Sequence, residues 1–300
     1  MKTKKYIKLF FIFIFSICAL ECINRYFYVE RKSTDFKVYK QYLRRKNNIE
    51  ILFLGDSHFT GISQDFLDKK SLALNLKGGS FFHLYCFLKK HLQSSESLKV
   101  LVLPVDLHSF SSYRLETSHI SKRYYFWSRF IRFKDLYQLL GMRAFLCNVY
   151  KLTLLDDNYR NDKDYGKDTI VSDAIDVVLV KNEADKHFKN SIAIDDRLVD
   201  YLKKILELCE IKNIKVVLIS TPLSKEYVEY SKQYIAQNEI YRRVINKEEL
   251  SRKIYGYKNY QDLFKNKNEC FNKDGHHLSK IGAHLFTSEV SEYTNKILED

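Results

Sequence analysis

The sequence predicts an α/β protein with a doubly wound, mostly parallel sheet. Short apolar runs rich in Leu and β-branched residues predict its strands, because each run is four to seven residues long and is stopped by turn-forming residues, as buried parallel strands usually are. These runs are Ile49–Leu54, Leu72–Asn75, Val100–Val105 and Lys215–Ser220. Helical stretches are expected between them, at Phe81–His91 and Asp196–Cys209. Reactive groups are therefore expected at the carboxyl ends of the strands.

The composition is that of a folded protein with a sizeable core. Its 300 residues are 45% hydrophobic and 15% aromatic, which excludes a disordered or fibrous chain. A formal net charge of +13 favours anionic surroundings such as envelope polymers, lipid headgroups or nucleic acid. No nucleic-acid recognition motif accompanies that charge, so nucleic acid is not an expected partner.

The first 24 residues predict a membrane anchor. Leu9–Leu20 is apolar apart from Ser16, and extension from Tyr6 to Phe27 reaches the length of a span. No small-x-small cleavage site follows, so a retained single-pass anchor is favoured over a cleaved signal peptide. The basic amino end is expected in the cytoplasm and the rest of the chain outside it, in the periplasm or at the cell surface.

Residues 25–48 predict a juxtamembrane connector with a helix near Phe36–Arg45, and residues 49–300 a catalytic domain. Residues 110–196 interrupt the alternation of strands and helices and are too long for a loop, so they predict a helical insertion over the strand ends. It contains the basic aromatic stretch Lys122–Phe133. That stretch fits either a surface that binds membrane or sugars, or an amphipathic helix whose aromatic side chains pack on the core.

The cysteines predict neither a metal site nor a cofactor. There is no Cys-x-x-Cys pair and no Cys/His cluster at zinc spacing. Cys86 and Cys209 fall among apolar residues of predicted helices, which favours buried free thiols over the alternative of two disulfides that would also use Cys147 and Cys270.

Two polar motifs stand at the ends of the predicted domain. Gly55-Asp56-Ser57-His58 follows the first strand, and Asp274-Gly275-His276-His277 lies near the C-terminus. A serine on a glycine-assisted turn after a strand exposes its hydroxyl and directs its own N–H toward a reacting carbonyl oxygen. Such a serine needs an imidazole and a carboxylate, which Asp274 and His277 can supply from one turn. The three-residue offset favours His277 over His276 as the base.

These motifs resemble the first and last blocks of the SGNH/GDSL hydrolase superfamily, from Ile49 to the C-terminus apart from the insertion. The resemblance implies a flavodoxin-like three-layer fold. It also implies Ser57 as the nucleophile, His277 as the general base and acid, and Asp274 as the carboxylate that orients it. Asn75-Leu76-Lys77-Gly78-Gly79 is similar to the second block, which implies an oxyanion hole built from Ser57, with Gly78, Gly79 and Asn75 as further candidates.

The third block departs from the superfamily pattern. Where Gly-x-Asn-Asp is expected, the chain has Pro104-Val105-Asp106-Leu107-His108, and an ionised Asp106 would accept rather than donate a hydrogen bond. His108, Asn75 or a backbone amide are the alternatives for the third donor. We expect five residues to line the site: Asp56, His58, Asp106, His108 and His276. The remaining histidines are expected to be ordinary helix or surface residues: His83, His91, His119, His187 and His284.

The resemblance and the anchor together predict a cell-envelope esterase or O-acyltransferase. Similar membrane-anchored members add acyl groups, chiefly acetyl, to surface polysaccharide or cell-wall polymers, or remove them, through an acyl-serine intermediate. The alternative is a non-catalytic SGNH-like scaffold, or a glycan-binding partner of a membrane-embedded acyltransferase. The altered third block favours this alternative, and the intact Ser57, Asp274 and His277 oppose it.

Overall fold

The computed structural model describes residues 34–116, 175–235 and 238–299, with residues 6, 7, 10–13, 15, 16, 19, 127, 129–131 and 135. Within this described part, no helix has both the length and the apolar character needed to cross a membrane. Most of residues 1–24 lie outside it, so the anchor stays a prediction.

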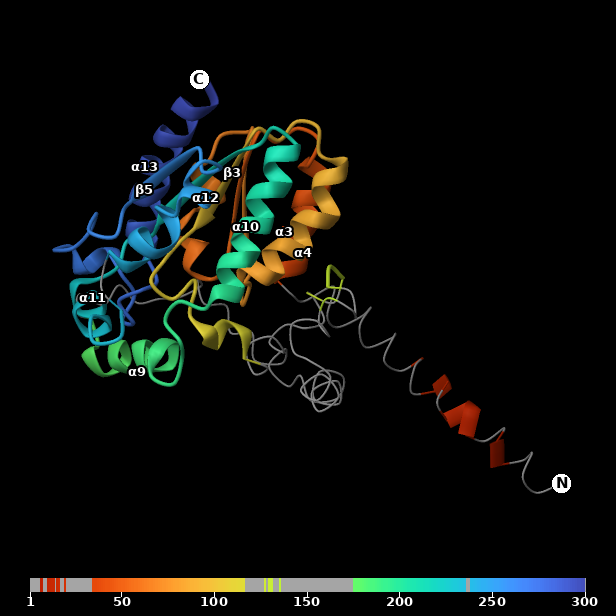
Figure 1. Ribbon diagram of the computed structural model, residues 1–300, viewed down its shortest axis with the longest axis horizontal. Coiled ribbons are helices and arrows are strands. Elements are labelled where there is room, and N and C mark those ends of the chain that lie inside the picture. The colour runs from red at the N-terminus through yellow and green to blue at the C-terminus, as the bar shows by residue number, and fades with distance from the viewer. Residues whose placement is uncertain are drawn as a thin grey trace.

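A five-stranded parallel sheet forms the centre of the protein (Figure 1). Its strands are β1 (Ile51–Gly55), β2 (Ser71–Asn75), β3 (Val100–Pro104), β4 (Lys215–Ser220) and β5 (Gly256–Asn259). They lie in the order β2-β1-β3-β4-β5, so the chain reverses direction across the sheet after β2. In parallel sheets, ligand sites form at the carboxyl ends of the strands beside such a reversal. The prediction of an α/β fold with a mostly parallel sheet is therefore confirmed.

The two faces of the sheet are covered by different helices. Leu52 and Leu54 belong to a large core with α3 (Thr34–Arg45), α4 (Phe81–His91) and α10 (Asp196–Ile211). Ile51 and Phe53 point to the opposite face, which α13 (Lys280–Glu299) covers. The alternation follows from the two-residue period of a strand.

Shorter elements connect the strands and helices. They are η2 (His58–Gly61), η3 (Gln64–Phe66), η4 (Leu92–Ser94), η5 (Ser112–Leu115), α9 (Val177–Phe188), α11 (Lys225–Ser231), the π-helical η7 (Tyr241–Ile245), α12 (Glu248–Ser251) and η8 (Asn268–Cys270).

The predicted strands and helices occur within a few residues of their expected bounds, and β5 is the strand that the sequence did not predict. The Gly256–Asn259 segment is polar and partly exposed because β5 is an edge strand, so it lacks the apolar run of the others. Asp195 caps α10 by accepting a hydrogen bond from the Arg197 N–H, and the apolar stripe of that helix is buried as expected.

Cys86 and Cys209 are buried, as predicted, and Cys270 is buried as well; Cys209 and Cys270 are free thiols. Cys147 lies outside the described residues.

Part of the predicted insertion packs onto the α4 side of the core. Trp127 is fully buried, and its ring centroid lies 4.7 Å from that of His83. Phe130 is buried against Tyr39 and Phe87. These aromatic side chains therefore belong to the core, while the rest of the Lys122–Phe133 stretch, apart from Arg129 and Ile131, lies outside the described residues.

The loop between η8 and α13 is held closed by backbone contacts. The Ser279 N–H donates to the Cys270 carbonyl oxygen at 2.9 Å, and the Asn272 N–H donates to the His277 carbonyl oxygen at 2.8 Å. Gly282, in the first turn of α13, packs directly on the Cys270 carbonyl. This close approach fixes the end of the loop that carries Asp274 and His277.

Gly282→Ala should lower the free energy of unfolding by about 1–3 kcal/mol, because the new Cβ would overlap the Cys270 carbonyl oxygen and force the helix away. Urea denaturation followed by circular dichroism measures the change. The neighbouring Ile281→Ala is the control, since Ile281 is 44% exposed and should change stability by less than about 0.5 kcal/mol. Equal effects of the two substitutions would contradict this account of the helix packing.

Candidate active site

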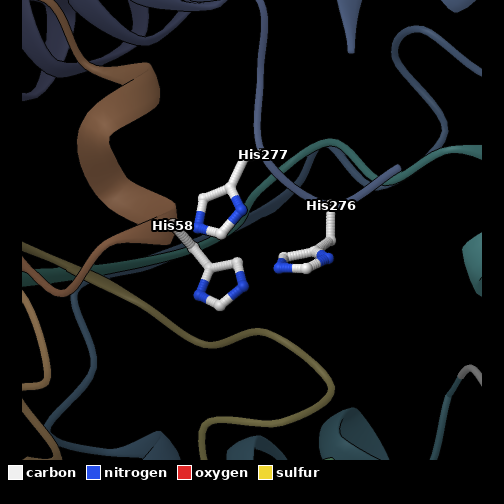
Figure 2. A group of neighbouring side chains, drawn as sticks. All are labelled: His58, His276 and His277. Atoms are coloured by element: carbon white, nitrogen blue, oxygen red, sulfur yellow. The ribbon is translucent and has the colours of Figure 1, made fainter. Parts of the chain in front are cut away.

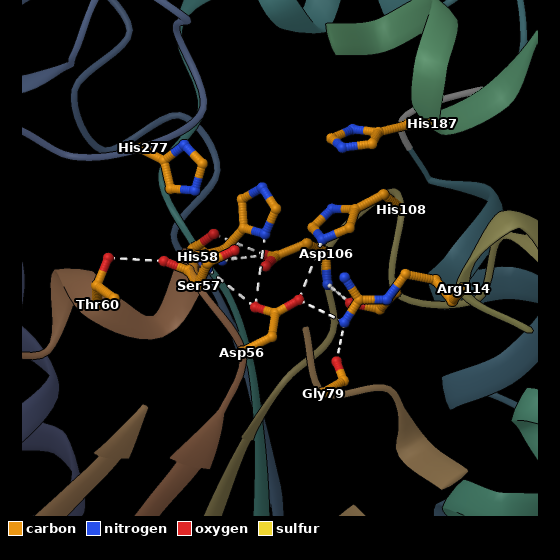
Figure 3. Close-up of polar contacts among 12 residues, drawn as sticks. Asp56, Ser57, His58, Thr60, Gly79, Asp106, His108, Arg114, His187 and His277 are labelled. Atoms are coloured by element: carbon orange, nitrogen blue, oxygen red, sulfur yellow. Dashed lines mark hydrogen bonds and ion pairs between the residues drawn. The ribbon is translucent and has the colours of Figure 1, made fainter. Parts of the chain in front are cut away.

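Ser57 lies on a tight turn at the carboxyl end of β1. The turn requires glycine at position 55, because a Cβ there would lie 2.6 Å from the Cβ of Phe59. Asp56 Oδ1 accepts a hydrogen bond from the His58 N–H at 2.9 Å, and the Ser57 carbonyl accepts one from Thr60 Oγ1 at 2.6 Å (Figure 3). The turn thus leaves Ser57 partly exposed at the carboxyl end of β1.

Asp274 and His277 form the pair that the sequence predicted. His277 Nδ1 lies 2.8 Å from Asp274 Oδ2, and the His277 N–H donates to Asp274 Oδ1 at 2.9 Å. Gly275 has a φ of +70°, which allows the chain to turn between them. Burial would raise the pKa of Asp274, but its contacts with His277 and His276 hold that pKa below its usual range. An ionised carboxylate therefore orients the His277 ring.

The structure favours His277 over His276 as the partner of this carboxylate. His276 Nδ1 lies 3.2 Å from the backbone carbonyl oxygen of Asp274 and 3.7 Å from the side-chain Oδ1. The His276 side chain is almost fully buried, whereas that of His277 is 26% exposed. A group that reacts with substrate must be accessible from solvent, as the His277 side chain is.

Folding brings the serine turn and the histidine loop together. The His58 and His277 rings are stacked, with centroids 4.7 Å apart and planes 6° apart (Figure 3). Ser57 directly precedes His58 and therefore lies on the same turn as the ring that stacks on His277. Ser57 Oγ makes no hydrogen bond with any described residue, including His277. Catalytic hydrogen bonds are often formed only when substrate is bound.

Backbone contacts distinguish the candidate oxyanion donors. The Gly79 N–H donates to the Leu76 carbonyl oxygen at 3.0 Å and is therefore occupied. Gly78 has a φ of +71°, and neither its N–H nor that of Ser57 has a hydrogen-bond partner in the described part of the chain. Asn75 directs its amide to the Ile62 carbonyl oxygen at 3.2 Å. The arrangement leaves the N–H groups of Ser57 and Gly78 free to receive a developing negative charge.

A buried arginine, which sequence reasoning missed, supports both glycine turns. Arg114 from η5 lies with its Nη2 2.5 Å from Asp56 Oδ2, and it also donates to the Gly79 carbonyl oxygen (Figure 3). Burial would raise the pKa of Asp56, but the Arg114 charge holds it well below its usual range. Asp56 was expected to line the site and instead lies beneath it, 5% exposed. No motif marks Arg114, because its partners lie on two other segments.

Five histidine rings gather around the serine turn. Their ring centroids are separated by 3.8 Å for His58 and His108, 4.8 Å for His58 and His276, and 4.9 Å for His108 and His187. The fifth ring is that of His277. Burial lowers the pKa of His58 and brings that of His108 to about 3, so these rings are neutral at pH 7.

Two expectations about these histidines need correction. His187 was expected to be an ordinary helix residue, but α9 places it in the cluster, with Nδ1 2.6 Å from the Tyr227 hydroxyl. His58 was expected to line the mouth of the site, but it is only 4% exposed.

The prediction of no metal site was based on the spacing of Cys and His residues along the chain. Ring nitrogens of His58, His276 and His277 lie within 4.8 Å of one another although they come from separate segments.

Asp106 joins the ends of β3 and β4 and is not an evident oxyanion donor. Its Oδ1 accepts from the Thr221 N–H at 2.6 Å and from the Thr221 hydroxyl at 2.8 Å. Its Oδ2 is buried without a hydrogen-bond partner among the described residues. Burial raises the pKa of Asp106 to about 7. His108, the other candidate from this block, has its Nε2 3.5 Å from Asp56 Oδ2.

No protein-family model and no curated protein matches the chain. Among solved structures, the chain is similar to a "putative acylhydrolase" from Bacteroides fragilis, with 13% sequence identity and a TM-score of 0.44, over 89% of this chain and 100% of that one. A likeness at this level carries no argument about activity, so the function rests on the geometry of the site.

Arg114→Leu should lower the free energy of unfolding by about 3–5 kcal/mol, because it leaves the buried Asp56 carboxylate without its partner. Chemical denaturation at pH 7 measures the loss. Arg242→Leu is the control: its pair with Glu239 lies at the surface, with the arginine side chain 65% exposed, and should be worth less than about 1 kcal/mol. Similar losses in both variants would show that the buried pair has no special role.

Asp106→Asn should stabilise the protein relative to wild type as the pH rises. The raised pKa of Asp106 contributes stability below about pH 4 that is lost as the pH approaches 7, and asparagine does not titrate. The difference in unfolding free energy between variant and wild type should therefore rise by roughly 2–4 kcal/mol from pH 4 to pH 8. Urea titrations at several pH values measure it, and a difference independent of pH would contradict the burial of a neutral carboxyl group.

Proposed function

We propose that the protein is a serine-dependent ester hydrolase or O-acyltransferase of the SGNH type. The single observation that carries the proposal is the hydrogen-bonded Asp274–His277 pair packed against the Ser57-His58 turn. The two segments lie more than two hundred positions apart in the chain. Serine, imidazole and carboxylate in this order are the groups that acyl transfer through a serine requires.

The proposed reaction begins with attack of Ser57 Oγ on the carbonyl carbon of an ester or thioester. The Oγ proton passes to His277 Nε2, and Asp274 stabilises the imidazolium that forms. The N–H groups of Ser57 and Gly78 receive the negative charge on the carbonyl oxygen. The carbon–oxygen or carbon–sulfur bond then breaks, the leaving group takes the proton from His277, and an acyl-serine remains.

The acyl group is released to water or to a sugar hydroxyl, with His277 removing the proton of the acceptor. We propose an envelope polysaccharide or cell-wall polymer as the acyl-bearing substrate or acceptor. The apolar leader at Leu9–Leu20 and the net charge of +13 support that assignment. The same leader supports placement of the domain outside the cytoplasm, on a single-pass anchor.

A second candidate is a non-catalytic SGNH-like scaffold that binds a glycan beside a membrane-embedded acyltransferase. The observation that favours it is that no hydrogen bond joins Ser57 Oγ to His277 among the described residues. Asp106, which stands where the superfamily has asparagine, supports it as well, because its Oδ1 accepts from Thr221 and its Oδ2 is buried. Ordered oxyanion N–H groups and an oriented His277 favour the catalytic candidate.

Ser57→Ala should abolish hydrolysis of an aryl acetate, lowering kcat by at least about a thousandfold, because the acyl-serine intermediate cannot form. His277→Gln should have a similar effect. Release of the aryl alcohol followed by absorbance measures the rate, and a fluorophosphonate label should attach to the wild type and not to Ser57→Ala.

Ser63→Ala is the control, since Ser63 follows the same turn and its side chain has no place in the proposed reaction. Wild-type turnover by Ser57→Ala would exclude the serine mechanism. A wild type that neither hydrolyses the ester nor takes the label would contradict the serine mechanism and favour the scaffold.

A further inference from the structure

Three imidazole rings converge from separate parts of the chain beside the serine turn. His58 comes from η2, and His276 and His277 come from the loop before α13 (Figure 2). One ring nitrogen from each lies within 4.8 Å of the other two. The ring centroids of His276 and His277 are 4.2 Å apart. The proposed acyl transfer uses only one of these rings, so the convergence of the other two is unexplained by it.

Each ring has an oxygen atom near its Nδ1. His277 Nδ1 lies 2.8 Å from Asp274 Oδ2, His276 Nδ1 lies 3.2 Å from the Asp274 carbonyl oxygen, and His58 Nδ1 lies 3.5 Å from Asp56 Oδ1. An oxygen at Nδ1 favours the tautomer with its proton there and its lone pair on Nε2. Histidines that bind metals almost always have such a partner for the nitrogen that is not coordinated.

The burial of the His58 ring is a second observation, independent of the ring spacing, that indicates a bound ligand. Its Nε2 is buried and has no hydrogen-bond partner among the described residues, and its Nδ1 has only the long contact with Asp56 Oδ1. Its side chain is 3% exposed. A buried polar atom left without a partner costs about 1–3 kcal/mol, so buried polar groups are normally paired with protein, water or an ion. An ion held between the rings would supply the missing partner.

We propose that His58, His276 and His277 bind a divalent transition-metal ion of the zinc class through their Nε2 atoms. Three neutral imidazoles suit zinc, copper or nickel, and three protein ligands leave a fourth position for water. The 26% exposure of the His277 side chain gives the ion access from solvent. Zinc at about 2.0–2.1 Å from each nitrogen would draw the rings closer together.

Two neighbouring groups of residues are less suited to an ion. Asp56, His58 and His108 also converge, but Asp56 is already paired with Arg114. Glu183, His187 and His276 form a third group, in which Glu183 pairs with Lys186 at 2.6 Å. The all-histidine group contains no carboxylate for such a cation to occupy.

The metal would regulate the proposed reaction, and this part of the inference rests on the proposed function. His277 Nε2 has one lone pair, which accepts either the Ser57 proton or a metal ion. Bound metal therefore removes the general base and inhibits acyl transfer reversibly. Chelation restores activity, because no covalent bond is made or broken when the ion leaves.

Cobalt(II) is the probe for binding, because its visible absorption reports imidazole ligands without reference to activity. Metal-stripped wild-type protein should bind one equivalent and develop a visible band. His58→Gln and His276→Gln should each weaken binding by at least about tenfold, with folding checked by circular dichroism. His284→Gln is the matched control, since His284 is exposed on α13 and lies against Phe66. Ser57→Ala should bind cobalt like the wild type.

Absence of a visible band, or equal cobalt affinity in wild type and His276→Gln, would overturn the metal site. In a second measurement, zinc should inhibit ester hydrolysis by wild type, and EDTA should reverse the inhibition. Zinc-stimulated hydrolysis that persists in Ser57→Ala would overturn the inhibitory role. Activity in metal-free Ser57→Ala would refute the serine mechanism and leave cobalt binding as the separate test of the site.

Discussion

The buried carboxylate of Asp56 is the constraint on which the site depends. It lies directly before Ser57 and is held between the Arg114 guanidinium and the backbone N–H of His58. Moving a carboxylate out of water is costly, and the cost is offset only when charges and donors surround it. Here those groups come from the serine turn, from η5 and from His108. One charge therefore fixes the relative positions of three segments.

Arg114 extends that constraint to the glycine turn after β2. The same guanidinium that pairs with Asp56 also donates to the Gly79 carbonyl oxygen, so the serine turn and the glycine turn share one anchor. The parallel register of Gly55 with Asn75 brings these turns side by side. Preorganised N–H groups stabilise charge effectively because they need no rearrangement during the reaction. In the proposed site, the buried Asp56–Arg114 pair would hold these N–H groups in place.

The histidine cluster gives the site two chemical possibilities. A neutral imidazole whose Nδ1 faces a carboxylate can act as a general base or as a metal ligand, because both roles use the lone pair on Nε2. The Nδ1 atom of His277 faces the Asp274 carboxylate in this way, and His58 and His276 lie beside it. The proposed function and the proposed metal site therefore compete for one atom, which makes inhibition by metal a direct consequence of the geometry.

Local sequence determined the strands, the main helices, and the pairing of Asp274 with His277, because apolar periodicity, turn glycines and a three-residue offset all act over a few residues. Tertiary structure alone decided the rest. The pairing of Asp56 with Arg114, the entry of His187 into the cluster, and the edge strand β5 all depend on segments that meet only after folding. The raised pKa of Asp106 depends on burial, which no local pattern reports.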